Sequence, residues 1–484
     1  MLNHALVGQA MRQARENERL TPQQVAALQD RKLRDLVRFA KEHSPFYGRL
    51  YKSLDPDRFE LADLPTVTKR LLQENFDDVV TDRRLNLAGV KAFCDQKRPD
   101  GPPWHLGEFA VLMSSGTSGE RGYFVLDGAA LADAIAVGYR QSNRAPAPSA
   151  SLGAMPTPVV PAGAMPTASV GMPPASPQPP QQRIAAVMLI EPFDAAGMLM
   201  RLIPESVGPK RLIDIRQDFE TVCRELNEFQ PTLLSSFPYL LRMLAEAAGD
   251  GRLRIAPARI TSSGDVLTAS DRSSVRAAFG LEPFDYYCST EVPYIAWEGD
   301  DHDGLHVNAD YAIVESVDAA YRPVPSARLG DKLLLTNLSN RAMPLIRYEM
   351  SDQVEYLAEG GGGPLPRIRT VAGRVEHVLS LPGVSGGRTS LIPEQIDEYL
   401  GGLEGLANYQ VIQETKSRLT VNFIPRAAEA AAGVGQALRA GLALCFERYG
   451  VSKDIEIDLR QVERLAPVRP GATKICHYWN RSLE

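Results

Sequence analysis

Several features that mark whole classes of protein are missing from this chain of 484 residues. Lysine and arginine form no long run and the formal net charge is -6, so the clustered cations on which nucleic-acid binding depends are absent. No apolar stretch is long enough to span a bilayer, and residues 1–20 lack the apolar core of a secretory signal. We therefore expect a cytoplasmic protein whose partners include neither a nucleic acid nor a membrane.

Cysteine is also scarce. The five cysteines lie far apart, without any CxxC pair, at Cys94, Cys223, Cys288, Cys445 and Cys476. Such an odd and scattered set is typical of reduced thiols in a cytosolic protein.

Charge is absent from one long segment. Between residues 145 and 182 no side chain is charged, and the pentapeptide Gly-Ala-Met-Pro-Thr occurs at 153–157 and again at 163–167. A composition dominated by Pro, Ala, Ser and Met cannot bury enough apolar surface to form a core. We expect a disordered surface insertion, with docking of a partner or carrier protein as the alternative.

After this segment, strand-like and helix-like runs alternate. The strand-like runs cover 184–190, 232–236 and 259–263, and the helix-like runs cover 219–229, 239–248 and 269–279. This rhythm predicts a largely parallel α/β sheet with helices on its faces. Beyond residue 373 an α+β pattern of the size of a small domain follows. The expected fold class is a large α/β N-terminal domain, with mixed sheets and flanking helices, plus a small α+β C-terminal domain.

The segment 114–122, Ser-Ser-Gly-Thr-Ser-Gly-Glu-Arg-Gly, has the residues most suited to phosphate. It lies between the apolar runs 109–113 and 123–126, so we expect a loop between two strands. Its glycines give the backbone close access to a ligand, and its hydroxyls can donate to phosphate oxygens. The Gly-Lys-Ser/Thr ending of a Walker loop is absent. An ordinary flexible turn is the alternative interpretation.

Further short motifs are SGD at 263–265, YYCSTE at 286–291, PLIRYEMSD at 344–352, GR at 373–374 and PGATK at 470–474. With the loop at 114–122 and LPTVTK at 64–69, they resemble the motifs of the adenylate-forming superfamily of acyl-CoA synthetases and adenylation domains. The likeness is greatest to its phenylacetate–CoA ligase and CapK-like branch, and it extends over most of the chain outside the insertion. It implies an adenylation domain over 1–373 and a mobile C-terminal lid domain over 374–484, with a hinge at Gly373-Arg374.

The resemblance also implies an ATP site. Its residues would be Ser114, Ser115, Gly116, Thr117, Ser118 and Gly119 on the phosphates, Ser263, Gly264, Asp265 and Tyr287 beside the adenine, Ser289 and Thr290 near the α-phosphate, Asp352 on the ribose, and Arg374 on ribose or phosphate. Glu291 would bind Mg²⁺, for which a carboxylate oxygen is a suitable ligand. Lys474 would bridge the substrate carboxylate and the α-phosphate, so Lys474, Thr117 and Glu291 are the expected catalytic residues. Phe237 and Tyr239 fall where the family places its acyl-pocket helix.

The reaction that the resemblance implies is ATP-dependent activation of a carboxylic acid, aryl or arylacetic, as an acyl-adenylate, followed by transfer to CoA. Transfer to a carrier protein, an amine or another nitrogen nucleophile is the first alternative. Four departures from the family pattern leave a non-catalytic nucleotide-binding scaffold as the second: Glu120–Gly122 in place of Pro-Lys-Gly, Cys288 for Gly, Glu376 for Asp or Lys, and an extra residue before Lys474. The oligomeric state stays open, with a homodimer as one alternative.

One rival grouping has the density of carboxylates and imidazoles that is typical of a metal site. It consists of Asp300, Asp301, His302, Asp303, His306 and Asp310. We favour a solvated acidic loop, because the stretch GLH-x-x-x-D at 304–310 resembles the segment that follows the TE motif in the same branch.

Overall fold

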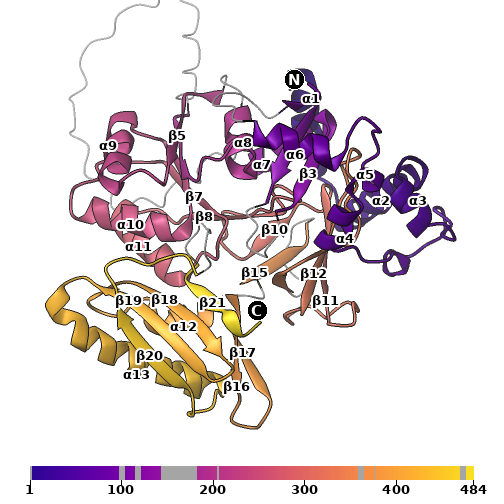
Figure 1. Cartoon of the computed structure of the whole chain (residues 1–484). Coiled ribbons are helices and arrows are strands. Elements are labelled where there is room, and N and C mark those ends of the chain that lie inside the picture. Colours follow the sequence, from indigo (N-terminus) through magenta and orange to yellow (C-terminus); the bar gives the residue numbers. More distant parts are fainter. Residues whose placement is uncertain are drawn as a thin grey trace, which may run out of the picture.

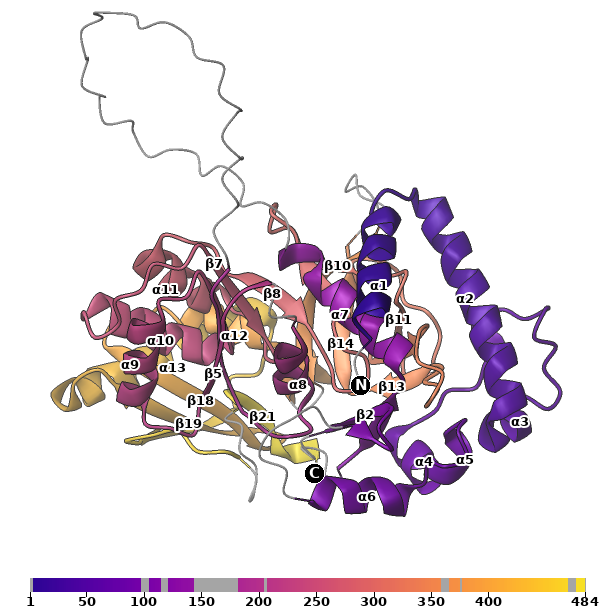
Figure 2. The same ribbon diagram turned by 90° about the horizontal axis from the view of Figure 1, so that it is seen from above.

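The computed structural model describes residues 3–96, 104–114, 121–142, 182–203, 207–357, 365–374, 377–468 and 476–483. The expected insertion at 145–182 lies outside these ranges except for Gln182. No helix in the described ranges combines the length and the apolar character that crossing a bilayer requires. Figures 1 and 2 show the N-terminal helices on one side of the molecule and the C-terminal strands on another.

The N-terminal part is helical. Its helices are α1 (His4–Asn17), α2 (Pro22–His43), α3 (Pro45–Leu50), α4 (Lys69–Glu74), α5 (Phe76–Val79) and α6 (Leu87–Asp95). The side chain of Thr21 accepts from the backbone N–H of Gln24 and so caps α2, and Pro22 occupies its first turn. The helical pattern is interrupted at Pro45, which cannot continue a helix but fits the first turn of the next one, α3.

A small antiparallel sheet presents the glycine-rich loop. It contains β1 (Trp104–His105), β2 (Phe109–Met113) and β3 (Tyr123–Leu126), and α7 (Gly128–Ser142) follows it. The loop at 114–122 connects β2 to β3, which confirms the predicted position between two strands. Its residues 115–120 lie outside the described ranges.

The largest sheet in the described part of the chain has nine strands. They are β4 (Ile184–Met188), β5 (Lys210–Asp214), β6 (Leu233–Ser236), β7 (Arg259–Ser263), β8 (Phe284–Tyr287), β9 (Ala296–Glu298), β10 (Leu305–Val307), β14 (Asp352–Tyr356) and β15 (Arg367–Arg374), in the order β14-β15-β10-β9-β8-β7-β6-β4-β5. The segment from β8 to β5 is parallel, whereas the pairs from β8 to β14 are antiparallel. The sheet is therefore mixed.

Helices connect the parallel strands, because such strands need crossover connections. The crossovers contain α8 (Ala195–Leu202), α9 (Phe219–Phe229), α10 (Pro238–Gly249) and α11 (Ala269–Phe279). With helices on both faces a parallel strand is buried throughout, as every residue of β4 is. The bounds of α9 and α11 are those predicted from the sequence.

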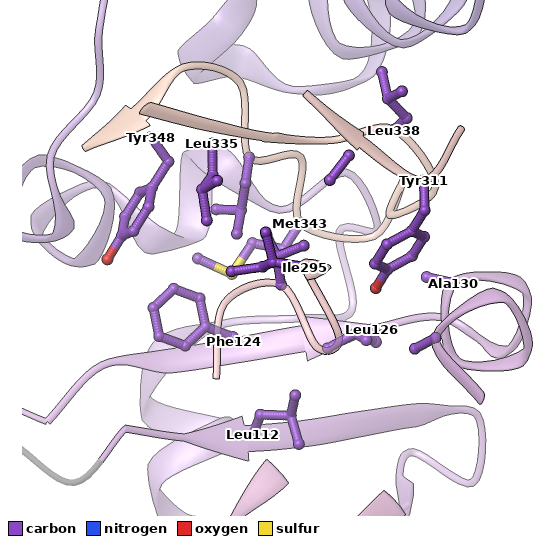
Figure 3. Packing of buried hydrophobic residues seen from close by; sticks show 14 of the residues in the cluster. Leu112, Phe124, Leu126, Ala130, Ile295, Tyr311, Leu335, Leu338, Met343 and Tyr348 are labelled. Carbon is purple, nitrogen blue, oxygen red and sulfur yellow. The ribbon is translucent and has the colours of Figure 1, made fainter. Parts of the chain in front are cut away.

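A third sheet contains β11 (Ala312–Val317), β12 (Lys332–Asn337) and β13 (Tyr348–Met350), all antiparallel. Its buried face packs on the small sheet beside the loop. Figure 3 shows Leu335 and Tyr348 on one side of this core and Leu112 and Phe124 on the other. The rings of Phe124 and Tyr348 meet edge to face, 6.1 Å between centroids, so the strand that follows the loop is held against β13.

The C-terminal unit (described residues 377–468 and 476–483) has its own apolar core. Its elements are β16 (Leu379–Pro382), β17 (Arg388–Leu391), α12 (Pro393–Leu400), β18 (Leu406–Thr415), β19 (Arg418–Pro425), α13 (Ala431–Tyr449), β20 (Glu456–Gln461) and β21 (Tyr478–Asn480). Four of these strands form a sheet in the order β20-β19-β18-β21. The predicted fold class, a large α/β part plus a small α+β part, is confirmed.

Candidate functional site

The lining of a cavity of about 1090 Å³ includes the carboxyl ends of the parallel strands. Residues just beyond β4, β6, β7 and β8 line it, namely Leu189, Phe237, Gly264 and Cys288. Open α/β sheets bind ligands at this edge, because the loops that follow the strands converge there. The other walls come from α7, α8, the segment before α4, the region around β13 and the C-terminal unit.

The base of the glycine-rich loop is part of this cavity. Ser114 lines it, and the loop stem is closed by hydrogen bonds from the backbone N–H of Ser114 to the carbonyl of Gly122 (2.9 Å) and from the N–H of Gly122 to Ser114 Oγ (2.8 Å). The predicted ligands Ser115, Gly116, Thr117, Ser118 and Gly119 lie outside the described residues, so their roles stay predictions.

Lys69 is a site residue that the sequence reasoning did not single out. Its Nζ donates to Ser114 Oγ at 3.0 Å, and the residue lines the cavity. A Cβ on Gly122 would lie 2.7 Å from Lys69 Cε, so glycine at 122 leaves room for the lysine stem. The cation at the loop base is therefore Lys69, whereas the exposed Arg121 approaches the sulfur of Met113 at 3.9 Å.

The position of Lys69 depends on a segment distant in sequence. Val67 pairs with Tyr348 in a parallel bridge, and its backbone exchanges hydrogen bonds with Arg347 (3.1 Å) and Glu349 (2.9 Å). The guanidinium of Arg347 binds the carbonyl of Leu64 at 2.7 Å. The LPTVTK segment, which the resemblance included without assigning it a role, is thus tied to the PLIRY motif. That contact could not be read from either motif alone.

The YYCSTE motif places a carboxylate in the cavity. Glu291 is 9% exposed, and Tyr348 Oη donates to its Oε1 at 3.3 Å. Thr290 also lines the cavity. Ser289 Oγ accepts from the backbone N–H of Val292 at 3.0 Å, which fixes the turn after β8.

Tyr287 and Asp352 come together although 65 residues separate them. Tyr287 Oη donates to Asp352 Oδ2 at 2.7 Å, and both side chains are buried at the cavity wall. The tyrosine holds the carboxylate in one orientation, because a hydrogen bond to an ionised acceptor is strong and directional. Asp352 also opposes Arg374 in the pairing of β14 with β15, although the side chain of Arg374 is outside the described set.

The SGD motif follows β7 at the same edge. Ser263, Gly264 and Asp265 all line the cavity, and Gly264 has a φ of +80°. A Cβ there would lie 2.9 Å from the ring of Phe237, so both conformation and space require glycine. The N-cap of the helix that follows, α11, is Thr268 and not a residue of this motif.

Phe237 and Tyr239 line the cavity at the start of α10, with parallel rings 6.1 Å apart. Burial raises the pKa of the Tyr239 hydroxyl to about 12, so it is neutral at physiological pH. The apolar part of the lining comes from α7, β4 and α8: Ile135, Tyr139, Ile184, Met188, Leu199 and Met200. Burial likewise raises the pKa of the Cys288 thiol to about 12, which makes it a packing group and not a nucleophile.

The rival metal site does not form within the described residues, where no group of three or more His, Cys, Asp or Glu side chains could hold an ion. Asp301 and Asp303 pair with Arg367 at 3.5 and 2.9 Å. Asp310 is buried in an ion pair with Arg140. Arginine thus neutralises carboxylates that, from the sequence, could have been metal ligands.

Lys474 lies outside the described residues, and so does Glu376 beside the predicted hinge. From the C-terminal unit, His377, Cys476 and Trp479 line the cavity. The C-terminal unit therefore forms one wall of the space that Ser114, Glu291 and Asp352 share.

No family model matches the chain. The phenylacetate–coenzyme A ligase of Thermus thermophilus is 26% identical over 428 residues, which cover 84% of this chain and 81% of that enzyme. The phenylacetate–coenzyme A ligase of Pseudomonas putida is 28% identical over 184 residues, 36% of this chain and 39% of that enzyme. The fumarate–(S)-2,3-diaminopropanoate ligase of Enterobacter agglomerans is 28% identical over 162 residues, 31% of this chain and 39% of that enzyme. The last two matches span less than half of those relatives.

Solved structures share the fold. The 2-hydroxyisobutyryl-CoA ligase in its postadenylation state, in complex with 2-HIB-AMP, superposes with a TM-score of 0.67 at 16% identity, covering 93% of this chain and 88% of that chain. The same ligase in complex with R3-HIB-AMP superposes with a TM-score of 0.66 at 16% identity, covering 91% of this chain and 86% of that chain.

Proposed function

We propose that this chain, a homologue of phenylacetate–CoA ligases with the fold of the adenylate-forming superfamily, activates a carboxylic acid with ATP. The observation that carries this conclusion is the single cavity that gathers Ser114, Glu291 and Asp352 from three distant segments. The carboxylate of the acid would attack the α-phosphorus of ATP. A new P–O bond forms, the bond to pyrophosphate breaks, and the products are an acyl-adenylate and pyrophosphate.

The side chains in the cavity suit the parts of ATP. Asp352, oriented by Tyr287, offers two acceptor oxygens for the ribose hydroxyls. Lys69, at the base of the loop, brings a positive charge to the place where the leaving phosphates would lie. These groups would position the substrates and stabilise charge in the transition state. Both effects account for most of the catalysis in phosphoryl transfer. Thr117 and Lys474 complete this proposal as predicted catalytic residues.

Glu291 fits a magnesium ion. Its carboxylate is a hard oxygen ligand in the cavity wall, oriented by the hydroxyl of Tyr348. A bound Mg²⁺ would neutralise charge on the phosphate oxygens. The part played by the chain is to hold the carboxylate there, and Tyr348 does so from a position fixed by its contact with Phe124.

The acid would occupy the apolar part of the cavity, where Phe237 and Tyr239 present aromatic surface. Aryl and arylacetic acids match such a wall, because rings stack favourably on aromatic side chains. The similarity to enzymes named phenylacetate–coenzyme A ligase supports the same class. CoA is the acceptor that these names favour, and its thiol would displace AMP from the adenylate.

An amine is the second candidate acceptor. One relative is named a ligase of fumarate and (S)-2,3-diaminopropanoate, which joins a carboxylic acid to an amino compound. The match covers 31% of this chain. It leaves transfer to nitrogen in place of sulfur as an outcome to be measured.

The decisive experiment is acid-dependent exchange of labelled pyrophosphate into ATP, over a panel of aryl, arylacetic and aliphatic acids. Exchange with aryl or arylacetic acids is the expected result, and turnover with long aliphatic acids only would contradict the proposed substrate class. Absence of exchange with every acid, despite ATP binding, would support the scaffold interpretation. With the active acid known, thioester formation with CoA is compared with AMP release that ignores CoA and requires an amine.

A further inference from the structure

The C-terminal unit meets helix α11 through hydrogen bonds from Ser270 to Asp397 and Gly401. Its apolar core is separate from the apolar cluster that contains α9 and α10. Figure 1 shows the unit beside α10 and α11, and α12 contacts α11. An interface between units that is polar, and not merged into one core, can separate at low cost, because its groups regain water.

Arg242 lies at this interface, where it lines a small cavity together with Asp397, Tyr409 and Tyr478 of the C-terminal unit. It lies on α10, is 9% exposed, and its Nε is 3.3 Å from Asp271 Oδ1 on α11. The other oxygen of Asp271 accepts from both the backbone N–H (3.1 Å) and the Oγ1 (2.8 Å) of Thr268, which closes the N-terminus of α11. Contacts between α10 and α11 therefore position the guanidinium without help from the C-terminal unit.

The C-terminal unit adds a chain of hydrogen bonds. Tyr409 Oη donates to Asp397 Oδ1 at 2.7 Å and is itself bonded to Tyr478 Oη, while the backbone N–H of Ser270 on α11 donates to Asp397 Oδ2 at 3.3 Å. Burial by itself would lower the pKa of Arg242, but the charges of Asp271 and Asp397 raise it. The guanidinium thus interacts electrostatically with groups on both sides of the interface.

Two adjacent glycines, Gly401 and Gly402, follow α12 and differ in their surroundings. The carbonyl of Gly401 accepts from Ser270 Oγ at 2.9 Å, and a Cβ at Gly401 would lie 2.6 Å from the Cβ of Ser270. Its φ of -64° is helical, so the backbone itself would accept alanine. A Cβ at Gly402 would have no atom within 4 Å. A Cβ at Gly401 would also lie 2.6 Å from Asp397 Oδ1, so glycine at 401 is required both by the close approach of α12 to α11 and by the carboxylate of Asp397.

We propose that Arg242, Asp271, Asp397 and Tyr409 are positioning residues, which lock the C-terminal unit onto α10 and α11 so that it closes the cavity for adenylation. We call this set of contacts the lock. It affects the cavity through His377, Cys476 and Trp479, the residues that the C-terminal unit contributes to the cavity wall. This inference rests on the proposed function, because it assigns the closed arrangement to the first half-reaction.

The test compares Gly401→Ala with its neighbour Gly402→Ala. The methyl group at 401 should force α12 away from Ser270, whereas the one at 402 points into open space. We expect Gly401→Ala to lower kcat for pyrophosphate exchange by about tenfold or more, because the locked population falls, and Gly402→Ala to stay within about twofold of wild type. Formation of thioester from CoA and a supplied acyl-adenylate should stay near the wild-type rate in both. Tyr409→Phe, which keeps the ring but removes the donor to Asp397, should act like Gly401→Ala.

Amide hydrogen exchange measures how often the interface opens, and it does not depend on catalytic activity. The amide of Ser270 donates across the interface, so peptides that contain residues 268–271 should exchange faster in Gly401→Ala than in Gly402→Ala. Equal exchange in the two variants would overturn the lock. Equal losses in adenylation and in transfer from the supplied adenylate would also overturn it, because they would indicate general damage. A wild-type protein that shows no pyrophosphate exchange would refute the proposed function, while the amide measurement would still decide on the lock.

Discussion

Replacing Lys69 with methionine tests the part of the site that only the structure reveals. Methionine keeps a stem of similar length in the space left by Gly122, but it removes the cation that lies 3.0 Å from Ser114 Oγ. If the leaving phosphates bind at this loop, they lose a positive charge at close range. The protein should still fold, because Lys69 is only half-buried and its apolar stem is retained.

The size of the effect follows from Coulomb's law. A cation and a phosphate charge about 4 Å apart interact by ~4 kcal/mol at an effective dielectric constant of about 20. Screening by solvent and salt at this half-exposed position should leave roughly half of that. A loss of ~2 kcal/mol corresponds to a fall of roughly thirtyfold in kcat/KM for ATP.

The assay is pyrophosphate exchange at varied ATP, at low and at high salt, for Lys69→Met and for Lys52→Met. Lys52 is exposed after α3, so its replacement removes the same charge without touching the cavity. We expect a loss in Lys69→Met that shrinks as salt increases, and none in Lys52→Met. Equal values of kcat/KM for the two variants at low salt would refute the reasoning.

Asp352→Asn should raise KM for ATP by about tenfold to a hundredfold, since a hydrogen bond to a charged group contributes about 1.5–3 kcal/mol and Asn can still accept from Tyr287; an unchanged KM would show that Asp352 does not bind the ribose. Asp310→Asn should destabilise the fold by about 3 kcal/mol at neutral pH, because it leaves Arg140 buried without its carboxylate. Burial would raise the pKa of Asp310, but the guanidinium of Arg140 and the amide of Asn17 outweigh it and lower the pKa. The native state then binds fewer protons than the unfolded state, so this stabilisation is complete above the unfolded pKa of about 4 and is lost as the pH falls further. Melting curves of wild type and Asp310→Asn should converge below that pH, and a constant difference in Tm would contradict the assignment.

Local patterns in the sequence were sufficient to predict many of the helices and strands. The helices at 219–229 and 269–279 have the predicted bounds, because apolar periodicity and polar N-caps are properties of contiguous residues. The strands β4, β6 and β7 were also predicted, β4 as a short apolar run and β6 and β7 as short strand-like segments that alternate with helix-like ones. The short strands β9 and β10 have three residues each, which is too few to show an alternating pattern.

The sequence by itself determined the class of fold, the position of the loop between two strands and the short motifs that contribute Ser114, Glu291 and Asp352 to the cavity wall, because each of these depends on neighbours in the chain. Only the tertiary structure decided which of them meet. The approach of Lys69 to Ser114, the hydrogen bond from Tyr287 to Asp352 and the contact of Gly401 with Ser270 join segments up to 131 residues apart. Such pairings depend on sheet order, register and the packing of separate layers, and those quantities are set by the burial of the whole chain and not by any one segment.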